Sequence, residues 1–167
     1  RIVVPTIPLA NQWKTALMHH MPDETWRPGF FGGGRKDDPD QRVMLYIINS
    51  ARDSLAGHIR RDLALKRPVF LICDECHHYQ SKENRKIFDF MSSELMESGL
   101  YFNLGLSATP FGSNNDSVLI RSLGERIYHY DFQDAVKDGV ISPFIVCETA
   151  ASFYPKEHKD MWRFRTG

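Results

Sequence analysis

The chain has 167 residues, of which 42% are hydrophobic and 25% are charged, and its formal net charge is zero. This length and composition are typical of one globular domain with a sizeable core, and no apolar run approaches the roughly 18 residues of a membrane span. A net charge of zero argues against a generally basic nucleic-acid binder. The three cysteines, Cys73, Cys76 and Cys147, are too few for a disulfide framework. A reducing, intracellular location is therefore expected, cytoplasmic or, in a eukaryote, nuclear.

Short apolar runs alternate with helical patterns along the whole chain. The expected strands lie at residues 2–4, 29–31, 43–48, 68–73 and 101–106. The expected helices contain residues 9–20, 55–63 and 87–95, the last from the four-residue steps between Ile87, Met91 and Leu95. Two further short helices are expected, one from Asp116 to Gly124 and one from Asp131 to Gly139, each with an aspartate cap and a terminal glycine. Residues 35–41 are polar and read as a surface loop.

Strands that alternate with helices predict an α/β domain with a mostly parallel sheet flanked by helices. The run at 68–73 is continuously apolar, as expected for a strand buried on both faces, and 101–106 is expected to be the next buried strand. Ligands of such sheets bind beyond the carboxyl ends of the strands. The loops to examine are therefore those that follow Val4, Ile48, Cys73 and Leu106.

Two adjacent acids follow one of these strands directly, in the sequence Asp74-Glu75-Cys76-His77. An aspartate at the end of a buried strand can hold Mg²⁺ through its water shell beside the phosphates of a nucleotide. A second carboxylate next to it can orient or deprotonate the attacking water. On its own this pattern is expected by chance in roughly one chain in 25 of this length.

The next expected strand is followed at once by Ser107-Ala108-Thr109-Pro110. The tripeptide Ser-Ala-Thr in that window has a chance probability of about one in a thousand, so coincidence explains the pair of motifs poorly. His77 can then connect the carboxylate loop to Ser107 and Thr109 by hydrogen bonds.

The two motifs resemble those of superfamily 2 helicases of the DExH type. Asp74-Glu75-Cys76-His77 resembles motif II, and Ser107-Ala108-Thr109 resembles motif III. Further resemblances lie in Val3-Val4-Pro5-Thr6 with Gln12-Trp13 (motif Ia), Gly32-Gly33 (motif Ib), the segment from Asn49-Ser50 to Leu55, and residues 132–143. The ending at 132–143 resembles that of transcription-repair helicases and of the motor subunits of type I and III restriction enzymes.

The resemblance implies a RecA-like first motor lobe over residues 1–150, with 151–167 as a linker. It implies an ATP-dependent helicase or translocase in which Asp74 positions Mg²⁺ through water and Glu75 orients the attacking water. His77, Ser107, Ala108 and Thr109 would couple this site to a nucleic acid, DNA in preference to RNA. Pro5, Thr6, Gly33 and Ser50 would contact the phosphates of that strand.

The family's phosphate-binding motif, Gly-x-Gly-Lys-Thr, has no match within the 167 residues. In the family this loop precedes motif Ia, and a second motor lobe follows the first. We therefore expect the sequence to be truncated before the phosphate-binding loop and to belong to a longer parent chain.

Two readings from other classes stay open. The chain could be a non-catalytic nucleic-acid-binding module that keeps the shape of a motor lobe. Cys73-Asp74-Glu75-Cys76-His77 is also a literal Cys-x-x-Cys-His, which occurs at haem-attachment and metal sites. A separate possibility concerns the basic stretch at residues 52–67, which reads either as a solvated helix face or as a nucleic-acid contact.

We expect residues 1–167 alone to show no measurable ATP turnover, because the backbone amides and lysine that cradle the phosphates are missing. A phosphate-release assay on the purified chain tests this. Steady turnover that disappears in a Glu75→Gln variant would contradict it.

Overall fold

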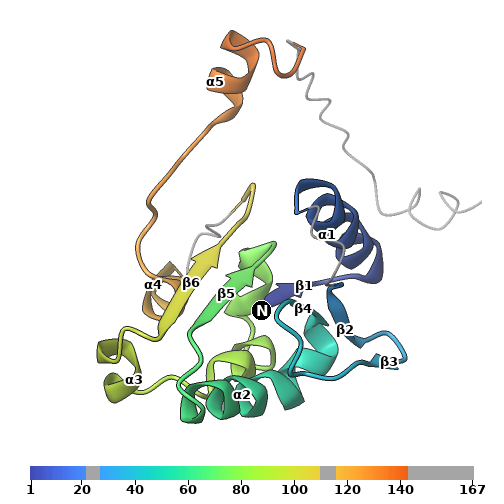
Figure 1. The fold of residues 1–167 in the computed structure, drawn as a ribbon. Helices are drawn as coiled ribbons and strands as arrows, with labels where there is room; N and C mark the ends of the chain where they lie inside the picture. The colour runs from blue at the N-terminus through green and yellow to red at the C-terminus, as the bar shows by residue number, and fades with distance from the viewer. Residues whose placement is uncertain (22–26, 110–115, 143–167) are drawn as a thin grey trace, which may run out of the picture. The chain divides into compact units, whose positions relative to one another are not determined.

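The computed structural model describes residues 1–21, 27–109 and 116–142 (Figure 1). Residues 1–126 form one compact unit, and residues 127–167 belong to a second unit that is described by itself. The predicted linker at 151–167 and Cys147 lie outside the described residues. No helix within the described ranges combines the length and the apolarity needed to cross a membrane.

Six strands of the first unit form one sheet in the order β3-β2-β4-β1-β5-β6. All neighbouring pairs are parallel except β2 with β3. The strands are β1 (Ile2–Val4), β2 (Gly29–Gly32), β3 (Arg35–Lys36), β4 (Met44–Ile47), β5 (Val69–Cys73) and β6 (Tyr101–Gly105). The predicted fold class, an α/β domain with a mostly parallel sheet flanked by helices, is confirmed.

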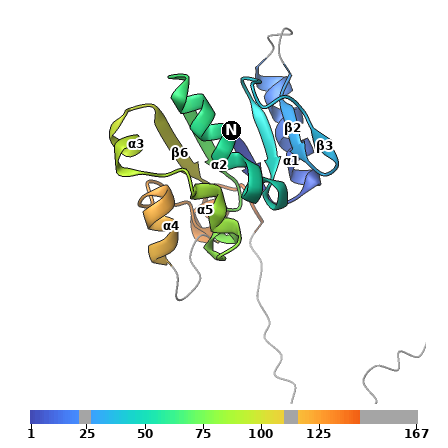
Figure 2. The same ribbon diagram turned by 90° about the horizontal axis from the view of Figure 1, so that it is seen from below.

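Helices cover both faces of this sheet (Figures 1 and 2). The helical elements of the first unit are α1 (Ile7–His20), α2 (Ile48–Ala64), the 3-10 turns η1 (Cys76–Gln80) and η2 (Asn84–Phe88), α3 (Ser93–Glu97) and α4 (Asp116–Leu123). Alternate residues of the strands point to opposite faces. Val4 and Leu45 pack in the cluster that includes Ala10 of α1, whereas Val3 and Tyr46 pack with Leu55 of α2.

The second unit contains α5 (Phe132–Lys137) within its described residues. The Asp131 side chain accepts a hydrogen bond from the Asp134 backbone nitrogen at 2.8 Å, and Gly139 has a φ of +70°. Both predicted end signals of this helix are therefore confirmed. In the first unit, α4 ends at Leu123, directly before Gly124, as predicted.

Three local expectations were wrong. The polar segment 35–41 contains the short strand β3, which pairs antiparallel with β2 after the turn at Gly33-Gly34. Strand β4 stops at Ile47, and α2 begins at Ile48, earlier than the apolar steps from Leu55 suggested.

The expected helix through Ile87, Met91 and Leu95 is instead two short elements, η2 and α3. There Ser92 caps α3 by accepting from the Leu95 backbone nitrogen, which begins a new helix instead of continuing the old one.

The expectations that the strand at 68–73 is buried on both faces and that the strand at 101–106 is buried were also wrong. Phe70 and Phe102, which are paired in register on β5 and β6, are 50% and 59% exposed. They lie on the same face as Ile2 and Ile72. In the described residues α1 contacts β1 and β4 on this side but leaves the Phe70–Phe102 area open.

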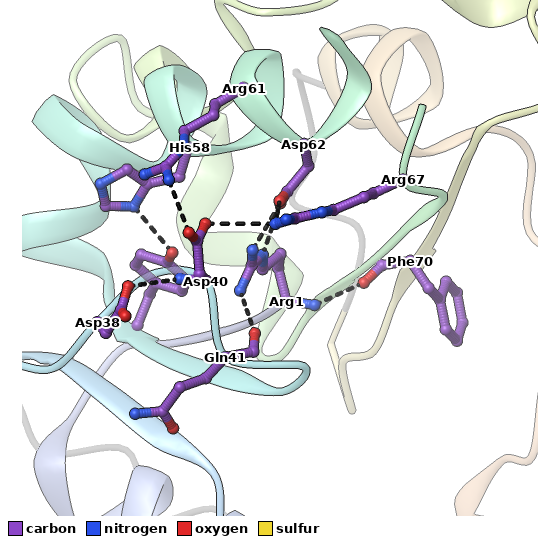
Figure 3. A network of polar contacts seen from close by, with 10 residues as sticks. Arg1, Asp38, Asp40, Gln41, His58, Arg61, Asp62, Arg67 and Phe70 are labelled. Carbon is purple, nitrogen blue, oxygen red and sulfur yellow. Dashed lines mark hydrogen bonds and ion pairs between the residues drawn. The ribbon is translucent and has the colours of Figure 1, made fainter. Parts of the chain in front are cut away.

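A buried ion pair ties the start of β1 to α2 (Figure 3). The Arg1 guanidinium lies 2.6 Å from Asp62, and both side chains are less than a tenth exposed. The same guanidinium donates to the Gln41 carbonyl at 2.9 Å. Close by, the exposed Asp40 pairs with Arg61 and Arg67. The buried pair thus fixes β1, α2 and the entry to β4 relative to one another.

We expect Asp62→Ala to lower the free energy of unfolding by about 3–5 kcal/mol, because it leaves the buried Arg1 charge without an opposite charge. Asp40→Ala, which removes exposed ion pairs from the same network, serves as the control and should cost about 1 kcal/mol or less. Urea denaturation of the two variants compares them. Equal losses would contradict the assignment of Asp62 as the structural partner.

Candidate nucleotide and nucleic-acid site

The loop after β5 is fixed by backbone hydrogen bonds to both neighbouring strands. The Asp74 nitrogen donates to the Val3 carbonyl at 2.9 Å, and the Cys76 nitrogen donates to the Leu106 carbonyl at 2.8 Å. In return, the Leu106 nitrogen donates to the Cys73 carbonyl at 2.9 Å. The parallel pairing therefore continues past the strand ends, and it places the two predicted motifs side by side.

Gly105 permits the close approach of these two loops. A Cβ atom at this position would lie 3.3 Å from both Cβ and Sγ of Cys76 and 2.8 Å from Cδ1 of Leu123. A side chain here would have to displace Leu123 and shift Cys76 by a few tenths of an ångström. The absence of a side chain at residue 105 thus permits the tight packing of the two loops.

Glu75 has a left-handed backbone conformation, with φ of 49°. For a residue with a Cβ atom this conformation costs roughly 1–2 kcal/mol. It is held by the Glu75 nitrogen, which donates to Asp74 Oδ1 at 3.0 Å, and by the His78 nitrogen, which donates to the Glu75 carbonyl at 3.0 Å. Such strain is common where a backbone must aim a functional side chain. Here it accompanies a Glu75 side chain that lines the pocket described below.

His77 lies between the acidic loop and the Ser-Ala-Thr segment. Its Nδ1 atom is 2.9 Å from Ser107 Oγ and 3.3 Å from Glu75 Oε2. Ser107 Oγ also accepts a hydrogen bond from the Thr109 nitrogen at 3.1 Å. The hydroxyl can therefore donate its proton to Nδ1, or accept from it, depending on the imidazole tautomer. Either arrangement links the two motifs through one side chain.

An open pocket of about 700 Å³ lies at this carboxyl edge of the sheet. Six residues predicted from the sequence line it, namely Pro5, Thr6, Glu75, His77, Ala108 and Thr109. It is also lined by Leu9, Ile48, Asn49, Arg52, His78 and Asn84. Asp74 and Ser107 are joined to this lining by their hydrogen bonds to Glu75 and His77. Glu75 and the Pro5-Thr6 segment, which was expected to hold nucleic acid, therefore share one cavity.

Gly33 and Ser50, also predicted as nucleic-acid contacts, lie beside this pocket without lining it. A Cβ atom on Gly33, whose φ is +61°, would come within 2.8 Å of Ile7 at the start of α1. A Cβ atom on Gly32 would come within 2.9 Å of Ser50 Oγ at the start of α2. The glycine turn thus packs against the first turns of both helices.

Arg52 is a pocket residue that the sequence reasoning did not single out from the basic stretch at 52–67. Its Nη2 donates to Asn49 Oδ1, while its Nε is buried and has no hydrogen-bond partner in the described part of the chain. Arg60 and Arg61, further along α2, bond instead to the Asp89 carbonyl and to Asp40. A helix predicted to begin at Ile48 would have placed Arg52 in its first two turns, near the carboxyl edge of the sheet.

The two described cysteines are free and buried. Burial raises the pKa of the Cys73 thiol well above its ordinary value and also raises the pKa of Cys76. Neutral thiols are poor metal ligands and poor nucleophiles. No group of three or more histidine, cysteine or acidic side chains among the described residues is arranged to hold a metal ion. The redox or haem reading of the Cys-x-x-Cys-His sequence therefore finds no support in the geometry.

Comparison with known proteins identifies the family of this chain. Residues 1–112 match the model of the family described as type III restriction enzyme, res subunit. The chain belongs to this family. The predicted resemblance to a superfamily 2 motor lobe with a RecA-like fold is thereby confirmed.

Among curated proteins, the DNA 3'-5' translocase XPB2 of Sulfurisphaera tokodaii is 32% identical over 109 residues. The aligned part is 65% of this chain and 21% of that translocase. The chain thus spans about one fifth of the length of this relative. The family match and this relative both indicate a helicase- or translocase-type motor.

Proposed function

We propose that the chain is part of the first lobe of an ATP-driven motor that moves along DNA. The observation that carries the proposal is the single pocket that contains Glu75 and His77 together with the starts of α1 and α2. One side of this pocket offers a carboxylate for hydrolysis, and the other offers hydroxyl, amide and guanidinium donors. The similarity to a protein named as a DNA translocase favours DNA over RNA as the track.

The carboxylate of Asp74 fits a magnesium ion held through water. Oδ1 accepts from the Glu75 nitrogen and Oδ2 accepts from the Trp13 indole, which leaves roughly two of its four lone-pair sites for metal-bound water. Magnesium in nucleotide sites typically takes one or two carboxylates together with substrate phosphates. When bound, it would neutralise charge on the phosphates of ATP. Those phosphates also require the Gly-Lys-Thr loop, which the 167 residues lack, so ATP coupling is proposed for the parent chain.

In this scheme Glu75 orients the attacking water and accepts its proton, since its carboxylate lines the pocket one residue beyond Asp74. His77 contacts both Glu75 and Ser107, so a change at the catalytic carboxylate reaches the loop at Ser107-Ala108-Thr109. This loop and a second motor lobe in the parent chain would convert hydrolysis into movement.

The nucleic-acid side of the pocket carries several donor groups. Helix α2 begins after Ile47, whose side chain cannot cap the first turn. Asn49 and Arg52 of this helix line the pocket, as does Thr6 at the start of α1. Amide, hydroxyl and guanidinium groups around one cavity suit a phosphodiester backbone without selecting a base sequence.

A non-catalytic binding module is the second candidate. The same donor-rich lining favours it, because binding a strand needs no acid pair. A motor requires the Glu75 carboxylate for ATP turnover, whereas a binding module does not, so a Glu75 variant separates the two candidates.

In the full-length protein we expect Glu75→Gln to leave ATP binding nearly normal and to remove turnover, because the amide keeps the size of the side chain but cannot accept a proton. Asp74→Asn should weaken Mg²⁺-dependent nucleotide binding as well. Nucleotide binding and phosphate release, measured on the same preparations, test both. Near wild-type turnover in Glu75→Gln would favour the binding-module reading.

For the chain itself we expect weak, sequence-independent binding of single-stranded DNA that depends on Arg52. Arg52→Ala should weaken binding several-fold and reduce the slope of log affinity against log salt by about 0.7, since one phosphate contact is lost. Thr6→Ala with Ser50→Ala should weaken binding with little change in slope, because these hydroxyls release no counterions.

Arg60→Ala with Arg61→Ala supplies the matched control on the same helix. These arginines do not line the pocket and bond to Asp89 and Asp40, so affinity and slope should stay close to wild type. Titration of a labelled oligonucleotide at several salt concentrations measures all three. A larger loss in the Arg60/Arg61 variant than in Arg52→Ala would move the binding face to the far end of α2.

A further inference from the structure

Trp13 of α1 contacts the carboxylate of Asp74 directly. Its indole Nε1 donates a hydrogen bond to Asp74 Oδ2 at 2.7 Å across 61 residues of sequence. The ring packs, partly buried, against the cluster that contains Val4, Ala10 and Ile47. Packing alone would satisfy a phenylalanine at this position. The indole nitrogen, by contrast, is directed at the carboxylate assigned to the metal.

This hydrogen bond completes the support of the Asp74 side chain. The Glu75 nitrogen holds Oδ1 and the Trp13 indole holds Oδ2, so both oxygens are fixed from opposite ends of the carboxylate. An indole N–H can donate but cannot accept, and it does not titrate. It therefore orients the carboxylate in its ionised form without competing for the remaining lone pairs. Partners of metal-site carboxylates typically change metal affinity or activity by 10–100-fold when removed.

The donor comes from a helix that also borders the nucleic-acid side of the pocket. Thr6 caps α1 by accepting from the Leu9 nitrogen at 3.4 Å, and Thr6 and Leu9 both line the pocket. Trp13 lies seven residues after Thr6, about two turns along the same helix. A shift of α1 on phosphate binding at its first turn would therefore move the indole relative to Asp74.

We infer that Trp13 is a positioning residue that orients Asp74 for Mg²⁺ and couples the nucleic-acid end of α1 to the metal carboxylate. The inference rests on the proposed function, in which Asp74 holds the ion through water. It adds a second connection between the two halves of the pocket, independent of the one through His77 and Ser107.

The test uses the full-length protein and the Mg²⁺ concentration needed for half-maximal binding of a fluorescent ATP analogue. Trp13→Phe removes the N–H and keeps an aromatic ring. It should raise the half-saturating Mg²⁺ concentration about tenfold, leave nucleotide binding without Mg²⁺ unchanged, and reduce the stimulation of ATP turnover by DNA. Thr15→Ala, which removes an exposed side-chain hydrogen bond from the same helix, should change none of these.

If Trp13→Phe does not fold, a closer analogue of tryptophan takes its place. Replacement of Trp13 by 3-benzothienylalanine keeps the shape of the indole, with sulfur in place of N–H, and should reproduce the shift in Mg²⁺ dependence. An unchanged Mg²⁺ dependence with only a lower melting temperature would show that Trp13 is purely structural and would overturn the inference. Absence of Mg²⁺-dependent nucleotide binding in the wild-type protein would instead overturn the proposed function, and the inference with it.

Discussion

The site depends on the parallel pairing of β1, β5 and β6, which continues into the loops beyond the strands. Backbone hydrogen bonds from Asp74 to Val3 and from Cys76 to Leu106 hold the acidic loop between its neighbours. These bonds leave the backbone of Glu75 in a left-handed conformation and bring His77 within reach of Ser107. The separation of the acids from the Ser-Ala-Thr segment is thus set by strand spacing, and side-chain contacts only refine it.

The two helices that complete the pocket are fixed by different means. Helix α1 is bound to the site through Trp13 and Asp74, whereas α2 is anchored at its far end by the buried pair of Arg1 and Asp62. The anchor and the pocket therefore lie at opposite ends of α2. A helix that is held firmly at one end and begins at the pocket with uncapped amides can present Arg52 in a defined position.

The parallel sheet and the placement of the acid pair could be predicted because both depend on local patterns. Apolar runs followed at once by Asp74-Glu75 or Ser107-Ala108-Thr109 identify strand ends, and the carboxyl ends of parallel strands meet at one edge. The helix predicted through Ile87, Met91 and Leu95 was wrong because a cap at Ser92 overrides the four-residue spacing.

The roles of Trp13 and Arg52 depend on tertiary contacts that the local pattern does not contain. Trp13 fits the apolar stripe of α1, and nothing in that stripe shows that its nitrogen meets a residue 61 positions away. Arg52 is one of several arginines in a basic stretch, and only the fold shows that it lines the pocket whereas Arg60 and Arg61 do not. The exposure of Phe70 and Phe102 was missed for a similar reason, since an apolar strand does not reveal how far a covering helix reaches.

Displacement of a third strand from triplex DNA by the full-length protein tests the account most directly. A motor that couples hydrolysis at Glu75 to movement on DNA should displace the third strand with ATP and fail to do so with a non-hydrolysable analogue. Substitution of Ser107 and Thr109 by alanine should retain part of the ATP turnover while displacement falls much further. Displacement that proceeds equally well with the non-hydrolysable analogue, or DNA binding without any ATP-dependent displacement, would contradict the account.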